Sequence, residues 1–268
     1  NSSPVFIINK KRGKTMKKTF KGLRNNQQKA IGVFMNCGCP EFLEIAASVG
    51  YDFVIIDNEH GLWSCEGNAH MIRAAESTGI VPIVRVSDIN EAEIKRGLDC
   101  GAAGVMIPNI SSVEQAKEAL RLSKFKPEGD RGACPFVRAN AYGRGVPAQY
   151  YADANRDVSV VLLVEGKGGI EAFDEIIELP GVDCIFFGPC DMAVSLGHPG
   201  DESHPDVHNA ICTMIRKARA KGIYVGMQGF DGKETRYWLD QGAEFGVTIG
   251  DLGLFYRICK QTLEDARG

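Results

Sequence analysis

The chain has 268 residues, 44% of them hydrophobic and 24% charged, which is typical of a folded globular protein and excludes collagen-like and disordered classes. Every apolar run is too short for a membrane-spanning helix, and we expect no membrane partner. The formal net charge is −3, yet residues 1–40 contain nine basic residues and no acidic one. We therefore expect residues 1–29 to form a basic, flexible arm. Residues 30–268 should form one domain, whose acidic excess argues against nucleic-acid binding.

Nine cysteines are scattered along the chain without a recognisable secretion signal. This usage predicts reduced thiols in a cytoplasmic protein. Cys37 and Cys39 are close together, but no second cysteine pair follows at zinc-site spacing, so we interpret them as structural.

From residue 30 onward, short apolar runs alternate with amphipathic stretches. The predicted strands are Ala30–Asn36, Asp52–Glu59, Val81–Val86, Gly104–Asn109, Val158–Glu165, Asp183–Gly188, Ile223–Gln228 and Glu244–Ile249. The predicted helices are Glu41–Val49, Ala69–Ser77, Glu91–Leu98, Val113–Leu122, Ile170–Leu179, Val207–Ala220, Lys233–Gln241 and Leu252–Ala266. Continuous apolar strands are typical of a parallel sheet covered by helices. Eight such units within this length predict an α/β fold of the (β/α)8 TIM-barrel type.

One long interruption, Lys126–Asp157, separates the fourth and fifth predicted strands. Its Gly, Pro and Arg content predicts a functional loop with a short helix near Pro147–Asn155.

Polar residues follow four of the predicted strands. The second strand leads into Asp57-Asn58-Glu59-His60, the third ends at Arg85, the fifth at Glu165 and the sixth in Gly188-Pro189-Cys190-Asp191. In a TIM barrel the chemistry lies at the carboxyl ends of the strands. We therefore expect these side chains to meet at one barrel mouth.

Glu165 and Asp191 are one βα unit apart and should lie on neighbouring strands. Two carboxylates with open coordination positions suit Mg²⁺, Mn²⁺ or a similar divalent ion. Such an ion could bind a 2-oxo acid and stabilise its enolate. The alternative interpretation is a pair of capping or ion-paired carboxylates.

His60 is a candidate general base, because histidine changes charge near physiological pH. Asp57 or Asp99 could orient it. Arg85 could hold a substrate oxyanion, or it could simply pair with Asp57 or Glu59. His204 and His208 flank Pro205 in a pattern typical of a helix start, and we interpret them as structural.

Two classes of reaction are disfavoured because the predicted strands do not have the residues that these reactions need. No lysine ends an apolar strand, which weakens a Schiff-base aldolase. No P-loop or dinucleotide-binding glycine pattern follows the first strand.

Several segments together resemble the HpcH/HpaI aldolases, a family of metal-dependent (class II) pyruvate aldolases, and in particular its 2-dehydro-3-deoxyglucarate aldolase branch. The resemblance runs from about residue 30 to the end of the chain. The matching segments are 50–60, 82–86, 94–101, 126–132, 164–165, 187–192, 196–200 and 204–207.

The resemblance implies specific roles. Glu165 and Asp191 would bind a divalent metal ion (Mg²⁺, Mn²⁺ or Co²⁺), His60 would be the base, Asp99 would raise its basicity, and Arg85 would stabilise developing charge. The backbone of Gly188, Pro189, Cys190 and Asp191 would contact the substrate carboxylate. The reaction would be reversible cleavage of a 4-hydroxy-2-oxo acid to pyruvate and an aldehyde. The resemblance also implies a homo-hexamer, a trimer of dimers, with an exchanged C-terminal helix.

Some positions depart from the family pattern. Leu163 stands where the family often has glutamine, and Asn58 where it often has glycine. These changes leave open a citrate-synthase-like or acyl-CoA lyase reaction, for which Arg131, Arg138 and Arg144 could bind coenzyme A. A third alternative is a non-catalytic barrel that binds a small acid.

Overall fold

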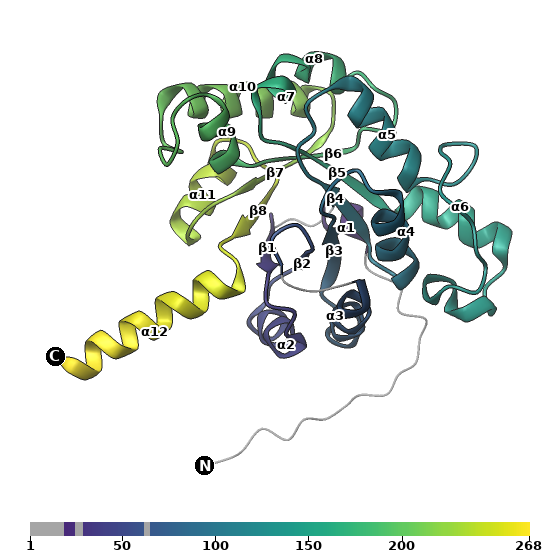
Figure 1. Ribbon diagram of the computed structural model, residues 1–268, viewed down its shortest axis with the longest axis horizontal. Helices are drawn as coiled ribbons and strands as arrows, with labels where there is room; N and C mark the ends of the chain where they lie inside the picture. Colours follow the sequence, from purple (N-terminus) through teal and green to yellow (C-terminus); the bar gives the residue numbers. More distant parts are fainter. Residues whose placement is uncertain (1–18, 25–28, 62–64) are drawn as a thin grey trace, which may run out of the picture.

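The computed structural model describes residues 19–24, 29–61 and 65–268. Its eight parallel strands pair in chain order, and β1 pairs with β8 to close the barrel, which confirms the predicted (β/α)8 fold (Figure 1). The strands are β1 Ala30–Met35, β2 Phe53–Asp57, β3 Val81–Arg85, β4 Gly104–Ile107, β5 Ser159–Val164, β6 Cys184–Phe187, β7 Tyr224–Gln228 and β8 Phe245–Thr248. Each lies within its predicted range.

Helices surround the barrel and connect its strands. They are α1 Phe20–Leu23, α2 Pro40–Val49, α3 Cys65–Thr78, α4 Glu91–Cys100, α5 Val113–Ser123, the 3₁₀ helix Arg138–Gly143, α6 Pro147–Asp157, α7 Lys167–Glu171, α8 Phe173–Ile176, α9 Pro189–Ser195, α10 Pro205–Ala220, α11 Gly232–Asp240 and α12 Asp251–Arg267. The single helix predicted over Ile170–Leu179 is instead two short ones, which meet at Ala172, where ψ is −2° and the helical path breaks.

The alternation of side chains along the strands creates two hydrophobic layers. One fills the barrel interior and includes Phe34, Phe53 and Phe245. The other lies between the barrel and its helices and includes Val54, Ile56 and Ile72. Because both faces of each strand are buried, the strands have the continuous apolar sequence from which they were predicted.

Helix α1 lies inside the region predicted to be a flexible arm. Its Phe20 is 1% exposed and packs edge-on against Phe53, with ring centroids 5.0 Å apart, and against Phe245 at 5.1 Å. Because these partners begin β2 and β8, α1 closes the amino-terminal end of the barrel. The expected arm is therefore corrected at residues 20–23, and its first 18 residues lie outside the described residues.

The last helix, α12, projects away from the barrel (Figure 1). It leaves a set of apolar side chains exposed, namely Leu252, Leu254, Phe255, Tyr256, Ile258 and Leu263. Among the described residues, no helix is long and apolar enough to cross a membrane.

Candidate active site

The four side chains predicted to meet do line one cavity. It has a volume of about 300 Å³ and is lined by His60, Arg85, Glu165 and Asp191, together with Gly188, Pro189 and Cys190. These residues follow β2, β5 and β6 or end β3, so the cavity is the carboxyl-end mouth of the barrel.

Arg85 is fixed at the floor of this cavity by two carboxylates. Its Nε and Nη2 donate to Asp57 at 2.8 and 2.7 Å, and its Nη1 lies 2.9 Å from a Glu59 oxygen. The guanidinium also lies 4.7 Å from the centroid of the Phe34 ring. Burial opposes its charge, but the hydrogen bond and negative charge of Asp57, and the charges of Glu59 and Glu165, raise the pKa of Arg85 above its ordinary value.

These contacts leave part of the guanidinium available. Arginine has five N–H donors, and the contacts with Asp57 and Glu59 account for three of them. The remaining donors belong to a residue that lines the cavity. Arg85 therefore combines both interpretations drawn from the sequence, since it is an ion-paired residue that can still bind an oxyanion.

His60 lies at the rim, and its side chain is 65% exposed. Its backbone N–H lies 3.4 Å from Asp57 Oδ1, and its Nε2 lies 3.9 Å from Glu59 Oε2. The buried Asp57 therefore holds the backbone of the turn that carries His60, and Arg85 holds Glu59 beside it. An imidazole in this position can exchange protons with both solvent and a molecule in the cavity.

Glu165 follows β5 directly and is 6% exposed. One oxygen accepts the backbone N–H of Asn109 at 2.7 Å, and the other faces Gly188, where an added Cβ would lie 2.6 Å from it. Burial raises the pKa of Glu165 to about 7, and the nearby charges of Glu59 and Asp191 act in the same direction. Glu165 is thus a carboxylate whose charged form is disfavoured by burial in the site.

The balance of charge in the mouth fits a divalent cation. Two carboxylates, Glu165 and Asp191, line the cavity, and Arg85 is the one arginine or lysine among the described residues that line it. Arg85 is paired with Asp57 and Glu59, and no ion pair to Glu165 or Asp191 is formed within residues 19–24, 29–61 and 65–268. Oxygen ligands of this kind suit Mg²⁺ or Mn²⁺.

Several lining residues were not predicted as site residues, and two of them, Asn36 and Gln228, carry polar side chains. Asn36 follows β1 and donates from Nδ2 to Asp57 at 2.5 Å, and Gln228 ends β7. Leu163 on β5 also faces the cavity. Asn36 and Gln228 could have been found from the sequence, because each is a polar residue at the carboxyl end of a predicted strand.

The structure does not bring Asp99 into this group. Asp99 is the penultimate residue of α4, and β4 begins five residues later at Gly104. Asp99 therefore lies at the amino-terminal end of the barrel. There it pairs with the buried Arg131 at 2.6 Å. The predicted role of Asp99 beside His60 is therefore not supported within one chain.

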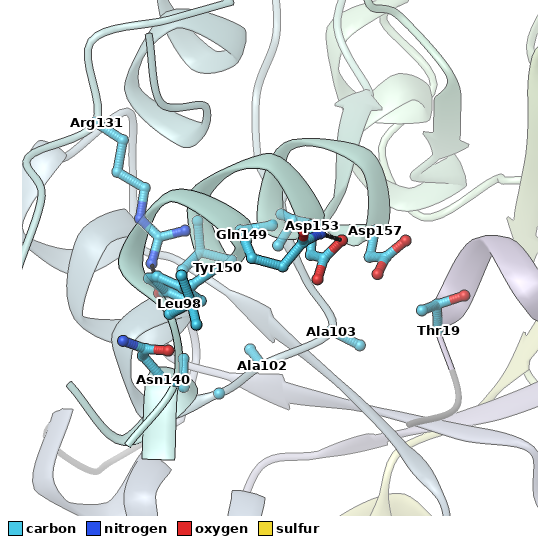
Figure 2. Close-up of a pocket in the computed structure, with 16 residues that line it drawn as sticks. Thr19, Leu98, Ala102, Ala103, Arg131, Asn140, Gln149, Tyr150, Asp153 and Asp157 are labelled. Carbon is cyan, nitrogen blue, oxygen red and sulfur yellow. Dashed lines mark hydrogen bonds between the residues drawn. The ribbon is translucent and has the colours of Figure 1, made fainter. Parts of the chain in front are cut away.

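The long interruption, Lys126–Asp157, also lies at that opposite end, because it connects helix α5 to strand β5. It surrounds a larger cavity of about 500 Å³, lined by residues that include Arg131, Tyr150 and Asp153 (Figure 2). Arg131 pairs with Asp99 and Arg138 pairs with Glu76, so within one chain these arginines do not form the expected coenzyme A groove at the mouth.

A family model described as "HpcH/HpaI aldolase/citrate lyase" matches residues 30–256. The chain belongs to the HpcH/HpaI family. This finding confirms the resemblance seen in the sequence and identifies the protein as an aldolase, a carbon–carbon lyase. A 5-keto-4-deoxy-D-glucarate aldolase of Shigella boydii serotype 18 is 34% identical over 246 residues, which cover 92% of this chain and 95% of that protein. The corresponding aldolase of Escherichia coli O6:H1 is 33% identical over the same shares.

Two solved structures show the same barrel. An HpcH/HpaI aldolase/citrate lyase family protein from Burkholderia cenocepacia J2315 has a TM-score of 0.86 and 33% identity, covering 92% of this chain and 98% of its own. The citrate synthase SbnG has a TM-score of 0.84 and 29% identity, covering 93% and 97%. Proteins with this barrel thus include some described as aldolases and one described as a citrate synthase. The substrates of this chain must therefore be inferred from the residues at its own barrel mouth.

Proposed function

We propose that this HpcH/HpaI protein is a divalent-metal-dependent aldolase that cleaves a 4-hydroxy-2-oxo acid to pyruvate and an aldehyde. One observation carries the proposal. Glu165 and Asp191, which have no described cationic partner, share a cavity with His60 and Arg85. Glu165 and Asp191 would hold Mg²⁺, Mn²⁺ or Co²⁺, which when bound would act as a Lewis acid on the 2-oxo group.

The chain's own residues supply the other steps. The remaining N–H donors of Arg85 bind the substrate oxygen on which negative charge develops. His60 removes the proton of the 4-hydroxyl group, directly or through one water, as the bond between C3 and C4 breaks. The first-turn N–H groups of α9, which begins at Pro189, have no partner within the helix and can bind the substrate carboxylate. The enolate left after cleavage takes up a proton at C3 from solvent to give pyruvate. In the reverse direction a C3 proton is first lost to solvent, and His60 returns its proton to the new 4-hydroxyl group.

An assay of pyruvate release tests the proposal. A panel of 4-hydroxy-2-oxo acids is supplied to the metal-stripped chain with and without Mg²⁺ or Mn²⁺. Release of pyruvate and the matching aldehyde only in the presence of metal is the expected result. No pyruvate from any member of the panel would contradict it.

The similarity to SbnG favours one second candidate, a citrate-synthase-like condensation. It would use a 2-oxo acid in place of the aldehyde acceptor and an acyl donor in place of pyruvate. Consumption of acetyl-CoA with oxaloacetate, together with no pyruvate release in the panel, would favour this candidate.

Arg85→Lys should lower kcat by about 10²–10³, the usual effect of losing one stabilising donor. Lysine keeps the charge but lacks the planar fork that binds Asp57, Glu59 and the substrate at once. Steady-state kinetics and the melting temperature are measured together, because Asp57 would lose part of its partner. A change confined to KM would show that Arg85 binds substrate and transition state equally.

Metal affinity should fall as the pH drops below about 7. The pKa of Glu165 is raised to about 7, chiefly by burial, so below that pH a proton must leave before the carboxylate can bind a cation. The apparent Kd for Mn²⁺, measured by calorimetry, should rise by up to about tenfold per pH unit below pH 7 and level off above it. A Kd that does not change with pH would contradict this coupling.

We also propose that the protein is a homo-oligomer in which α12 packs on a second copy. A cavity of about 660 Å³ lies over β1 and β8 beside α11 and is lined by residues that include Ile31, Leu239 and Thr248. This is where the last helix of a (β/α)8 barrel would pack, yet α12 projects away (Figure 1). Exposed apolar area of this kind marks an interaction surface.

Ile258→Glu should therefore reduce the molecular mass measured by analytical ultracentrifugation. Ile258 is 60% exposed in one chain, and a charge there would be buried in the oligomer. Gln261→Glu, which adds the same charge at another exposed position of α12, is the control. An unchanged mass for Ile258→Glu would contradict the proposal.

A further inference from the structure

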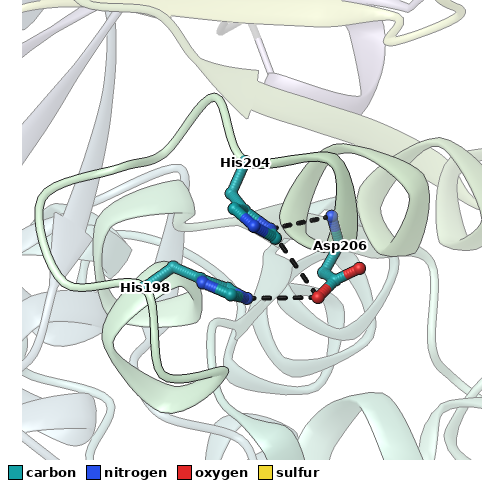
Figure 3. Close-up of side chains that lie close together, drawn as sticks. All are labelled: His198, His204 and Asp206. Atoms are coloured by element: carbon teal, nitrogen blue, oxygen red, sulfur yellow. Dashed lines mark hydrogen bonds and ion pairs between the residues drawn. The ribbon is translucent and has the colours of Figure 1, made fainter.

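Two imidazoles and one carboxylate meet in the segment between α9 and α10. His198 Nε2 lies 3.1 Å from Asp206 Oδ2, and His204 Nδ1 lies 3.6 Å from the same oxygen. One ligand atom from each residue lies within 4.8 Å of the others. Figure 3 shows the two rings side by side with Asp206 bridging their edges. The sequence pattern predicted only a helix start here, and α10 does begin at Pro205 with His204 as its cap.

The spacing fits a first-row transition metal. Zinc binds histidine nitrogen at about 2.0–2.1 Å and carboxylate oxygen at about 2.0–2.2 Å, so tetrahedral ligands lie roughly 3.3–3.5 Å apart. The two distances to Asp206 Oδ2, 3.1 and 3.6 Å, lie on either side of this value. The His198 and His204 side chains are 25% and 30% exposed, so a fourth position can be filled by water.

The charge state of the cluster also suits a cation. The His198 and His204 rings stack with centroids 3.3 Å apart and planes 14° apart. His204 Nδ1 accepts the backbone N–H of Asp206, so this nitrogen has a lone pair that it could offer to a metal ion. Within the described part of the chain, the ion pairs of Asp206 are with these two histidines, and no lysine or arginine neutralises it.

The backbone holds the segment in this shape without a metal. His198 N donates to Ala193 O at 2.8 Å, Asp201 N donates to His198 O at 3.0 Å, and His204 N donates to Asp201 O at 3.1 Å. Metal binding would replace two hydrogen bonds, the one of 3.2 Å from Asp206 N to His204 Nδ1 and the one of 3.1 Å between His198 Nε2 and Asp206 Oδ2. The backbone of the segment is therefore in place before binding, and the two stacked rings would turn out of their stack so that both nitrogens point at one ion.

We propose that His198, His204 and Asp206 form a second divalent metal site, selective for Zn²⁺, Co²⁺ or Ni²⁺. Imidazole nitrogen favours these ions, whereas the carboxylates of the barrel mouth favour Mg²⁺ or Mn²⁺. The proposal does not depend on the proposed function, because it uses none of the mouth residues.

The second site lies on a segment that contacts the mouth. Glu202 stands between the two histidines in the chain, and Cys190 lines the catalytic cavity beside Asp191; burial raises the pKa of the Cys190 thiol to about 11, and the nearby Glu202 acts in the same direction. An ion held by His198, His204 and Asp206 would fix this segment against the rim. We expect bound Zn²⁺ to raise the melting temperature.

Metal binding by the stripped, tag-free chain tests the proposal. Zn²⁺ stoichiometry is measured by equilibrium dialysis for the wild-type chain, for His198→Gln and for Asp206→Asn. His208→Gln, which removes another imidazole of α10, is the matched control. We expect His198→Gln and Asp206→Asn each to bind one equivalent fewer than wild type, or with a Kd more than about tenfold higher. The control should bind as wild type does, and this difference holds whether or not the mouth pair binds zinc.

The absorption spectrum of the Co²⁺-loaded chain gives a second readout. The signal lost in His198→Gln should be the d–d bands of nitrogen and oxygen ligation, without thiolate charge transfer. Equal Zn²⁺ stoichiometry in wild type and His198→Gln would overturn the proposal. So would an equal loss in His208→Gln, a thiolate spectrum for the lost ion, or full competition by Mg²⁺. Circular dichroism of each variant excludes unfolding as the cause.

Discussion

Asp191→Ala should reduce the rate of aldol cleavage by at least about 10³-fold, and no excess of Mg²⁺ or Mn²⁺ should restore it. A bound metal acting on the 2-oxo group contributes several kcal/mol to transition-state stabilisation, and each 1.36 kcal/mol is about a factor of ten in rate. With Asp191 removed, Glu165 alone would not hold a labile divalent ion. The wild-type chain in excess chelator should lose activity to the same extent, but adding metal should restore it.

Activity that is lost reversibly in chelator but permanently in Asp191→Ala would show that the metal ion, and not the folding of the chain, is affected. Asp201→Ala removes another exposed carboxylate, on the segment after α9, and should retain wild-type rates. Asp191 is itself exposed, so its replacement should leave the free energy of unfolding nearly unchanged. Full activity of the wild-type chain in excess chelator would contradict the metal-dependent mechanism and would leave the family assignment intact.

The barrel was predictable because its elements follow local physical rules. β2 and β5 are buried along their whole length, so their apolar sequence is continuous. Gly50 and Gly101 end α2 and α4 with φ of 104° and 106°, a conformation that favours glycine. Helix α1 was not predicted, because the stabilising contact of Phe20 is with Phe53 and Phe245, which are distant in the chain.

The residues of the barrel mouth could be predicted because the carboxyl ends of parallel strands meet at one edge of the sheet. His60, Arg85, Glu165 and Asp191 were placed together by that rule and do line one cavity. The same rule accounts for Asn36 and Gln228, which stand at the carboxyl ends of β1 and β7 and also line the cavity. The role of Asp99 stays a prediction for the assembled protein, because one chain alone does not bring Asp99 to His60. The position of Asp99 in the sequence matched, but the end of α4 lies at the other end of the barrel. The spacing of His198, His204 and Asp206 depends on turns in a loop, which the sequence pattern did not show.

His60→Ala should lower kcat by about 10²–10⁴, the usual contribution of one general acid–base group. Aldol cleavage requires removal of a proton from the 4-hydroxyl group. Among the residues lining the cavity, His60 combines a suitable side chain with access to solvent, since it is 65% exposed and is not held in a bidentate ion pair as Arg85 is. Because of that exposure, the substitution should leave the melting temperature nearly unchanged.

Rescue by added imidazole distinguishes a proton-transfer role from a structural one. Imidazole in the buffer should restore part of the cleavage rate of His60→Ala, because the space left at the rim is open to solvent and Glu59 remains anchored by Arg85. His208→Ala, another histidine outside the mouth, should lose no activity and show no response to imidazole. Exchange of the pyruvate methyl protons with solvent should continue in a variant that fails only at the hydroxyl step. If His60→Ala retains wild-type cleavage, the base is another group and the proposed proton path is wrong.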